Sequence, residues 1–170
     1  MSDTRRIAAI AAQVLRGLGV FLLLWPLLPP LFRLVHLDAI ADAVGAPWAI
    51  SCHRDPERTL SLFGSKMPMC SRCMGISIGA GAGLLLGRPY RGPGFMWVWL
   101  AAATAFMLVD VYEVNADHHH VFHPSRIATG LLLAFPVAAA ASAIARRESK
   151  PAAPPVSRPR ASGDARRRRA

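Results

Sequence analysis

Three cysteines and five of the six histidines of this chain fall into two short clusters. The cysteine cluster consists of Cys52-His53 and, sixteen residues later, Cys70-x-x-Cys73. The histidine cluster consists of His118, His119, His120 and His123. Thiolates and imidazoles are the side chains that hold zinc or copper in proteins. The two clusters are therefore the first places to look for chemistry.

Three thiols and one imidazole form a Cys3His set, which is a common ligand composition of tetrahedral zinc sites. The C-x-x-C half lets a single turn present two sulfurs to one ion. The pattern predicts a zinc site with the metal ligands Cys52, His53, Cys70 and Cys73. If His53 points elsewhere, the three sulfurs leave an open position for water or a substrate group.

A redox function is the main alternative for the same cysteines. A C-x-x-C at the start of a helix has its thiolate favoured by the helix dipole and here by Arg72. Cys70 and Cys73 would then exchange electrons through Cys52, in a plan similar to the quinone-linked disulfide-forming membrane enzymes. Those enzymes generally need two cysteine pairs, whereas this chain has three cysteines. A third reading is a structural or assembly protein whose outer loop is stapled by the metal.

The histidine cluster is a weaker signal than the cysteines. An i, i+3 or i, i+4 pair of imidazoles can bind a metal, but exposed histidine runs in loops often bind nothing in particular. Pro124 is expected to end any helix at this point. We interpret the run as an optional neighbour of the cysteine cluster.

Long apolar stretches indicate the elements that position these residues. Hydrophobic residues make up 53% of the chain and occur in runs with little polar alternation, which is typical of membrane proteins. We predict an all-α fold, a bundle of four transmembrane helices within residues 1–147, followed by a disordered basic tail over 148–170. Pro26, Pro29 and Pro30 are expected to kink the first helix. The predicted spans are residues 17–35, 70–87, 94–112 and 126–145.

The distribution of Arg and Lys predicts the orientation of the bundle. Residues 1–16, the 88–93 turn and the tail carry an excess of basic residues, whereas residues 33–69 balance four cations against four acids. Short basic loops stay in the cytoplasm. Both termini are therefore expected to be cytoplasmic, with both clusters extracytoplasmic, and the net charge of +10 is a topology signal that does not indicate nucleic-acid binding. The competing interpretation of the N-terminus is a cleaved signal peptide, which would still leave both clusters on the extracytoplasmic side.

Two further patterns concern packing. Gly75, Gly79 and Gly83 recur every fourth residue and leave one helix face bare, which favours close helix packing within the bundle or between copies in a homo-oligomer. Asp110 lies at membrane depth and is expected to pair with Arg126 or with Arg72.

The cysteine cluster resembles the signature of the family known as domain of unknown function 2085. That family has C-H-x-x-P-E-R-S-F, then P-x-C-A-R-C-T-G-I-Y-x-G, later an intramembrane Asp and R-x-x-T-G. The resemblance implies a small multi-helix membrane protein without an assigned reaction. This chain departs from the pattern at Thr59, Leu60, Met74, Ser77 and Val111. The matching residues are Cys52, His53, Pro56, Glu57, Arg58, Gly64, Pro68, Cys70, Arg72, Cys73, Gly75, Ile76 and Gly79, with Asp110, Arg126, Thr129 and Gly130 similar to the later part.

Overall fold

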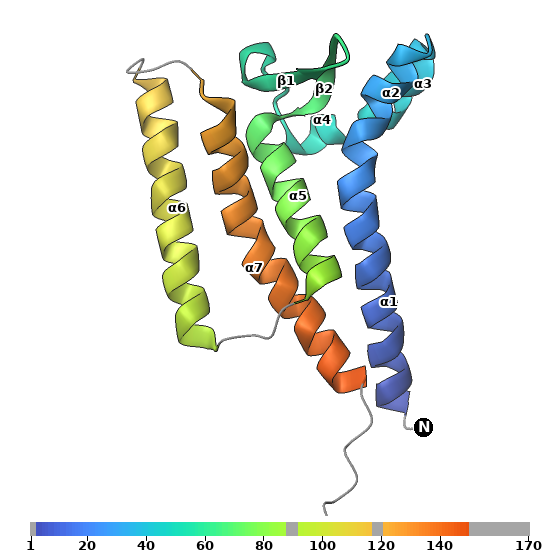
Figure 1. The fold of residues 1–170 in the computed structure, drawn as a ribbon, viewed down its shortest axis with the longest axis vertical. Coiled ribbons are helices and arrows are strands. Elements are labelled where there is room, and N and C mark those ends of the chain that lie inside the picture. The colour runs from blue at the N-terminus through green and yellow to red at the C-terminus, as the bar shows by residue number, and fades with distance from the viewer. Residues whose placement is uncertain (1–2, 88–91, 117–120, 150–170) are drawn as a thin grey trace, which may run out of the picture.

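A computed structural model describes residues 3–87, 92–116 and 121–149 of the chain, and these residues are mostly helical (Figure 1). Three helical stretches are long and apolar enough to cross a membrane, and one further apolar helix is shorter. The long stretches are Arg6–Leu34, Gly94–Val114 and His123–Ser149. The helices are α1 (Asp3–Leu24), α2 (Leu28–Leu34), α3 (Asp38–Gly45), α4 (Trp48–Ser51), α5 (Ser71–Leu86), α6 (Pro93–Asn115) and α7 (His123–Ser149).

The prediction of a helical membrane protein is confirmed, with differences at the boundaries. The first helix starts at Asp3 and not near residue 17. The predicted span over residues 70–87 corresponds to α5, but its 16 residues reach only about 24 Å, less than the roughly 30 Å of a hydrocarbon core. That α5 also spans the membrane, as the predicted four-helix bundle requires, therefore stays a prediction. Of the tail predicted over 148–170, residues 148 and 149 belong to α7, and residues 150–170 lie outside the described part of the chain.

The prolines of the first helix have the expected effect. Pro26 lies in a 3₁₀ turn, Trp25–Leu27, that separates α1 from α2. Pro29 and Pro30 then occupy the first turn of α2, where a missing N–H costs little. The prolines thus interrupt the helix with a tighter 3₁₀ turn, after which the chain continues as α2 (Figure 1).

The prediction of an all-α fold is wrong for the segment before α5. Strands β1 (Thr59–Leu62) and β2 (Ser65–Cys70) form an antiparallel hairpin that covers one end of the bundle (Figure 1). The two residues of its turn, Phe63 and Gly64, have φ angles of 53° and 77°. Both central residues of a type I′ turn need positive φ, and Gly64 adopts it without strain. The hairpin was missed because phenylalanine is an unusual first residue for such a turn.

The core of the bundle is the contact of α5 with α7. Gly75, Gly79 and Gly83 are buried, and each faces the backbone of α7. A Cβ atom at Gly79 would lie 2.7 Å from the carbonyl oxygen of Leu131, and one at Gly83 would lie 2.5 Å from that of Phe135. The glycine face is therefore filled by a helix of the same chain, which leaves no room there for a second copy.

The C-terminal end of α5 is capped by side chains from α7. Gly87 takes a left-handed conformation with a φ of 47° just after the helix. Arg146 donates hydrogen bonds to the carbonyl oxygens of Leu84 and Leu85, at 3.0 and 2.6 Å, and the Ser142 hydroxyl donates to Leu84 at 2.8 Å. These bonds satisfy carbonyls that a helix end leaves unpaired. Side chains of α7 thus cap the last turn of this short helix.

Helix α6 lies on the outside of the bundle, next to α7 (Figure 1). Its apolar side chains are widely exposed, with Trp97 at 72% and Val98 at 71%. An apolar surface of this extent is typical of contact with lipid. The Trp99 indole donates a hydrogen bond of 2.8 Å to the carbonyl oxygen of Leu132 and ties the helix to α7.

Replacing Gly75 by alanine should destabilise the protein strongly, because a Cβ at this position overlaps the carbonyl oxygen of Ile127. Overpacking of this kind costs typically about 1–3 kcal/mol. Gly17→Ala is the matched control, since nothing lies within 4 Å of a Cβ there. Thermal unfolding in detergent should show a lower melting temperature for Gly75→Ala alone. Equal melting temperatures for the two variants would contradict the tight α5–α7 contact.

Candidate metal centre

The three cysteine sulfurs lie together at the end of the bundle that carries the hairpin. The sulfur atoms of Cys52, Cys70 and Cys73 are all within 4.8 Å of one another. Cys52 is buried, with 6% of its surface exposed, and the other two are half-buried. In a tetrahedral site with Zn–S bonds of about 2.3 Å, the sulfurs would be roughly 3.8 Å apart. The cluster has the size and composition to hold a metal after a small contraction.

Three separate elements position these sulfurs. Cys52 follows α4 directly and has an extended backbone, with φ −139° and ψ 130°. Cys70 ends β2 and is the N-cap residue of α5, and Cys73 lies in the first turn of that helix. In the hairpin, Thr59 pairs with Cys70, and this register fixes the position of the Cys70-x-x-Cys73 segment relative to β1. The cluster therefore depends on the hairpin that covers it.

Hydrogen bonds favour a thiolate at Cys70. The Cys73 thiol donates to the Cys70 sulfur, and this bond is the main reason that the pKa of Cys70 is lowered to about 4, although burial opposes the shift. The backbone N–H groups of Cys73 and Arg72 and the Cys52 thiol act in the same direction. The backbone N–H of Cys70 in turn donates to the Cys52 sulfur at 3.2 Å. A thiolate is both the metal-binding and the nucleophilic form of cysteine.

His53 does not join the sulfur cluster. Its side chain is exposed, and the group of neighbouring ligand atoms consists of the three sulfurs. Successive side chains of an extended backbone point to opposite sides, which explains why Cys52 turns inward and His53 outward. Of the histidine run, His118, His119 and His120 lie outside the described residues. His123 is the first residue of α7, and its Nδ1 is buried without a hydrogen-bond partner among the described residues.

A partly buried ion pair lies beside the cluster. Arg72 donates to Asp110 Oδ2 at 2.5 Å, and the Ser125 hydroxyl donates to Asp110 Oδ1 at 2.9 Å. Of the two partners expected for Asp110, the structure thus selects Arg72. Both oxygens of the carboxylate are engaged, so Asp110 holds α5, α6 and α7 together and is poorly placed to act as a base. Ser125 was not identified from the sequence, where only its neighbour Arg126 stood out.

Arg126 is a buried cation with no carboxylate partner among the described residues. Only 4% of its surface is exposed, and its Nε is unsatisfied among the described residues. The charged groups that act on it include Arg72, Asp110 and Cys70. Because Asp110 is already paired with Arg72, Arg126 adds a positive charge near Cys70 that no ion pair within the described part of the chain neutralises. Such a charge stabilises thiolates.

The Pro56–Arg58 segment supports the hairpin. It forms a 3₁₀ turn whose N-cap, Asp55, accepts a hydrogen bond from the backbone N–H of Glu57 at 3.1 Å. Asp55 also pairs with the Arg58 Nε at 3.1 Å. The Glu57 side chain is exposed. This turn shapes the entry into β1.

Comparison with known proteins places the cysteine cluster in a family. A 29-residue stretch is 62% identical to an uncharacterized protein of Methanothermobacter thermautotrophicus, over 17% of this chain and 26% of that protein. A 47-residue stretch is 39% identical to an uncharacterized protein of Methanocaldococcus jannaschii, over 28% of this chain and 30% of the relative. The matches thus span less than a third of either relative's length. No solved structure matches this chain.

The family comparison covers more of the chain than these relatives do. The family described as "Predicted membrane protein (DUF2085)" matches residues 52–140, which is just over half of the chain. The match includes the three clustered cysteines, the Arg72–Asp110 pair and Arg126. The chain therefore belongs to the DUF2085 family of predicted membrane proteins.

Proposed function

We propose that the protein binds one zinc ion through the thiolates of Cys52, Cys70 and Cys73. The observation that carries this proposal is the convergence of three sulfurs from three different elements to within 4.8 Å. Since His53 points outward, the fourth coordination position is left to water or to a donor group of a ligand. A closed structural zinc site uses four protein ligands, whereas an open position is typical of sites that act on a substrate.

The charges around the cluster support a divalent ion. Three thiolates and one divalent cation carry a net charge of −1, and the Arg126 guanidinium beside them supplies +1. The Arg72–Asp110 pair is neutral as a unit. A buried site of this kind is stable only when its charges balance. A monovalent ion on the same three thiolates would leave one negative charge uncompensated.

We also propose that α5 spans the membrane together with the three longer stretches, with both termini in the cytoplasm. The start of α1 and the end of α7 lie at one end of the bundle, and the hairpin lies at the other (Figure 1). Basic residues predominate in the segments that connect at the first end. In this orientation the sulfurs face the extracytoplasmic side, where an ion enters from outside.

Purified protein should contain about one zinc per chain, because three thiolates form one coordination centre. Cys52→Ser, Cys70→Ser and Cys73→Ser should each lose most of the bound zinc. His53→Ala should keep both the stoichiometry and the affinity, and it is the matched control within the same loop. Metal content by mass spectrometry and competition with a fluorescent chelator measure both quantities. Full zinc occupancy in the three serine variants would refute the site.

Arg126→Gln should weaken zinc binding by roughly tenfold, as expected when a group that supports metal ligands is removed. Arg126→Lys keeps the positive charge and should weaken zinc binding less than Arg126→Gln does. Arg16→Gln, on an exposed part of α1, is the control for a change in net charge. The same chelator competition gives the affinities. An affinity of Arg126→Gln equal to that of the unaltered protein would show that Arg126 does not balance the site.

The low pKa of Cys70 favours a second candidate function, thiol–disulfide exchange. In oxidised protein, a substrate thiolate would attack the Cys70 sulfur of a Cys70–Cys73 disulfide, forming a mixed disulfide and releasing the Cys73 thiolate. A second substrate thiolate would then attack the substrate sulfur of the mixed disulfide and release the Cys70 thiolate, which its low pKa makes a good leaving group. The substrate loses two electrons and becomes a disulfide, the Cys70–Cys73 pair is reduced to two thiols, and a membrane quinone is the class of acceptor that would restore the Cys70–Cys73 disulfide.

In metal-free protein, Cys70 should react with iodoacetamide at nearly the same rate at pH 6 and pH 8, because a pKa of about 4 keeps it ionised throughout. An ordinary thiol with a pKa near 8.5 reacts roughly tenfold faster per pH unit over this range. Cys73→Ala removes the main hydrogen bond, raises the pKa of Cys70 and should slow the reaction at pH 6. Mass spectrometry of the labelled peptide gives the rates. A steep rise in the Cys70 rate with pH would argue against the exchange function.

A further inference from the structure

A second site lies on the same end of the molecule, away from the sulfurs. A cavity of about 400 Å³ opens between α2 and α3 on one side and the hairpin on the other. Its inner wall is apolar, with Pro29, Ala41, Met67 and Pro68 all buried. A volume of this size accommodates a small molecule or a lipid headgroup.

The polar part of the cavity is strongly cationic. Three cations line it, Arg33, Arg54 and Lys66, together with a single acid, Asp42. Arg33 pairs with Asp42 at 2.5 Å, which accounts for one cation. The nearby Asp55 is not a lining residue and is paired with Arg58. The lining thus carries a net charge of +2 (three cations and one acid).

The two remaining cations are held in place by groups without formal charge. Arg54 donates a hydrogen bond to the carbonyl oxygen of Gly45, and the Lys66 ammonium donates to that of Pro56 at 2.7 Å. Arg54 also has a φ of 51°, a left-handed conformation that an arginine rarely adopts. The Arg54 and Lys66 side chains are therefore oriented before any ligand binds. The carbonyl groups that hold them do not neutralise their charges.

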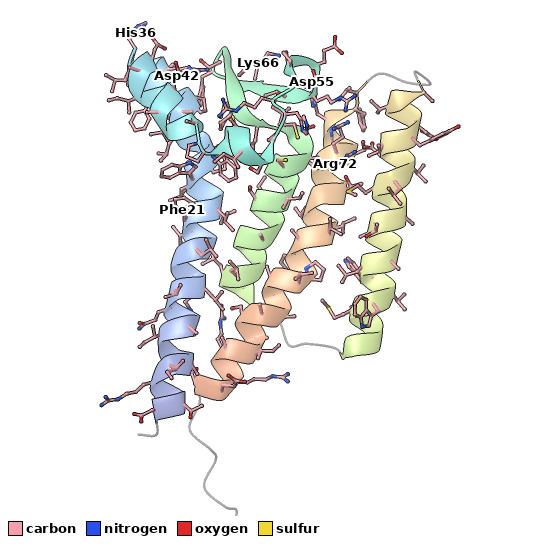
Figure 2. The ribbon with its side chains drawn as sticks, turned by 180° about the vertical axis from the view of Figure 1, so that it is seen from behind. Phe21, His36, Asp42, Asp55, Lys66 and Arg72 are labelled. Atoms are coloured by element: carbon pink, nitrogen blue, oxygen red, sulfur yellow. The ribbon has the colours of Figure 1, made fainter. Side chains whose placement is uncertain are left out.

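The position of the cavity indicates that the lipid bilayer is the source of the anion that its cations would bind. It adjoins the end of α2, where the apolar stretch Arg6–Leu34 ends. Large apolar side chains are exposed around this level, among them Leu34, Val35 and Ile40. Figure 2 shows Asp42 and Lys66 at this same end of the bundle. An apolar exposed rim next to a cationic cavity matches the boundary between lipid tails and phosphate groups.

We propose that this cavity binds the phosphate headgroup of an anionic phospholipid, with Arg54 and Lys66 as the phosphate-binding residues. The apolar wall accommodates the carbon atoms next to the phosphate. Arg33 stays paired with Asp42 and lies at the edge of the cavity. The site is independent of the proposed zinc centre, since none of its lining residues is a cysteine.

The test uses the full-length protein in phosphatidylcholine nanodiscs with a small fraction of phosphatidylglycerol. Native mass spectrometry counts the lipids that remain bound. The unaltered protein should retain phosphatidylglycerol in preference to phosphatidylcholine. The double variant Arg54→Gln/Lys66→Gln should lose about thirtyfold in this preference, given the usual contribution of two cations near an anionic headgroup. Asp42→Asn should strengthen the preference severalfold, because it removes the single acid of the cavity and frees Arg33.

Arg6→Gln, which removes one exposed charge at the opposite end of α1, should leave the preference unchanged. Helical circular dichroism and zinc content show whether each variant is folded, and treatment with chelator should leave lipid retention intact. Equal retention by the double variant, or a weaker preference in Asp42→Asn, would overturn the proposal. Binding of soluble glycerol 3-phosphate as tightly as of phosphatidylglycerol would assign the cavity to a soluble phosphate ester instead.

Discussion

The close approach of α5 to α7 is the constraint on which the other features depend. Helices in a bilayer gain little from the hydrophobic effect when they associate, so they rely on surfaces that fit without gaps. Glycines at 75, 79 and 83 bring the backbone of α5 against that of α7. Gly130 does the same from α7, facing the carbonyl oxygen of Arg72. This contact fixes the first turn of α5, which carries two of the three clustered sulfurs and the arginine that binds Asp110.

The polar groups at that end of α5 complement one another. The N-terminus of a helix carries a partial positive charge, and the half-buried Arg72 and the buried Arg126 add to it. Asp110 neutralises Arg72, and the Cys70 thiol, whose pKa is lowered, supplies a negative charge near Arg126. At the opposite end of the same helix, Arg146 caps the carbonyls of Leu84 and Leu85. Protein groups thus interact with both ends of α5.

Much of this arrangement was accessible from the sequence. Apolar runs of spanning length predicted the long helices, and the spacing of Cys70 and Cys73 with an upstream Cys52 predicted that the sulfurs would meet. The glycine repeat predicted a packing face, but spacing alone could not identify α7 as its partner. The hairpin was missed because its strands are short and its turn begins with Phe63. The outward direction of His53 follows from the extended backbone at Cys52, which no local sequence signal reveals.

The tight α5–α7 contact also limits how an ion could move through the protein. Permeation along a helix pair needs a continuous file of water or polar groups, and water needs far more room than a single carbon atom. Between these two helices not even a Cβ fits at Gly79 or Gly83. An ion held at the sulfurs therefore has no path toward the other membrane face along this interface. The α5–α7 interface is thus a seal between the two ends of the bundle and not a passage.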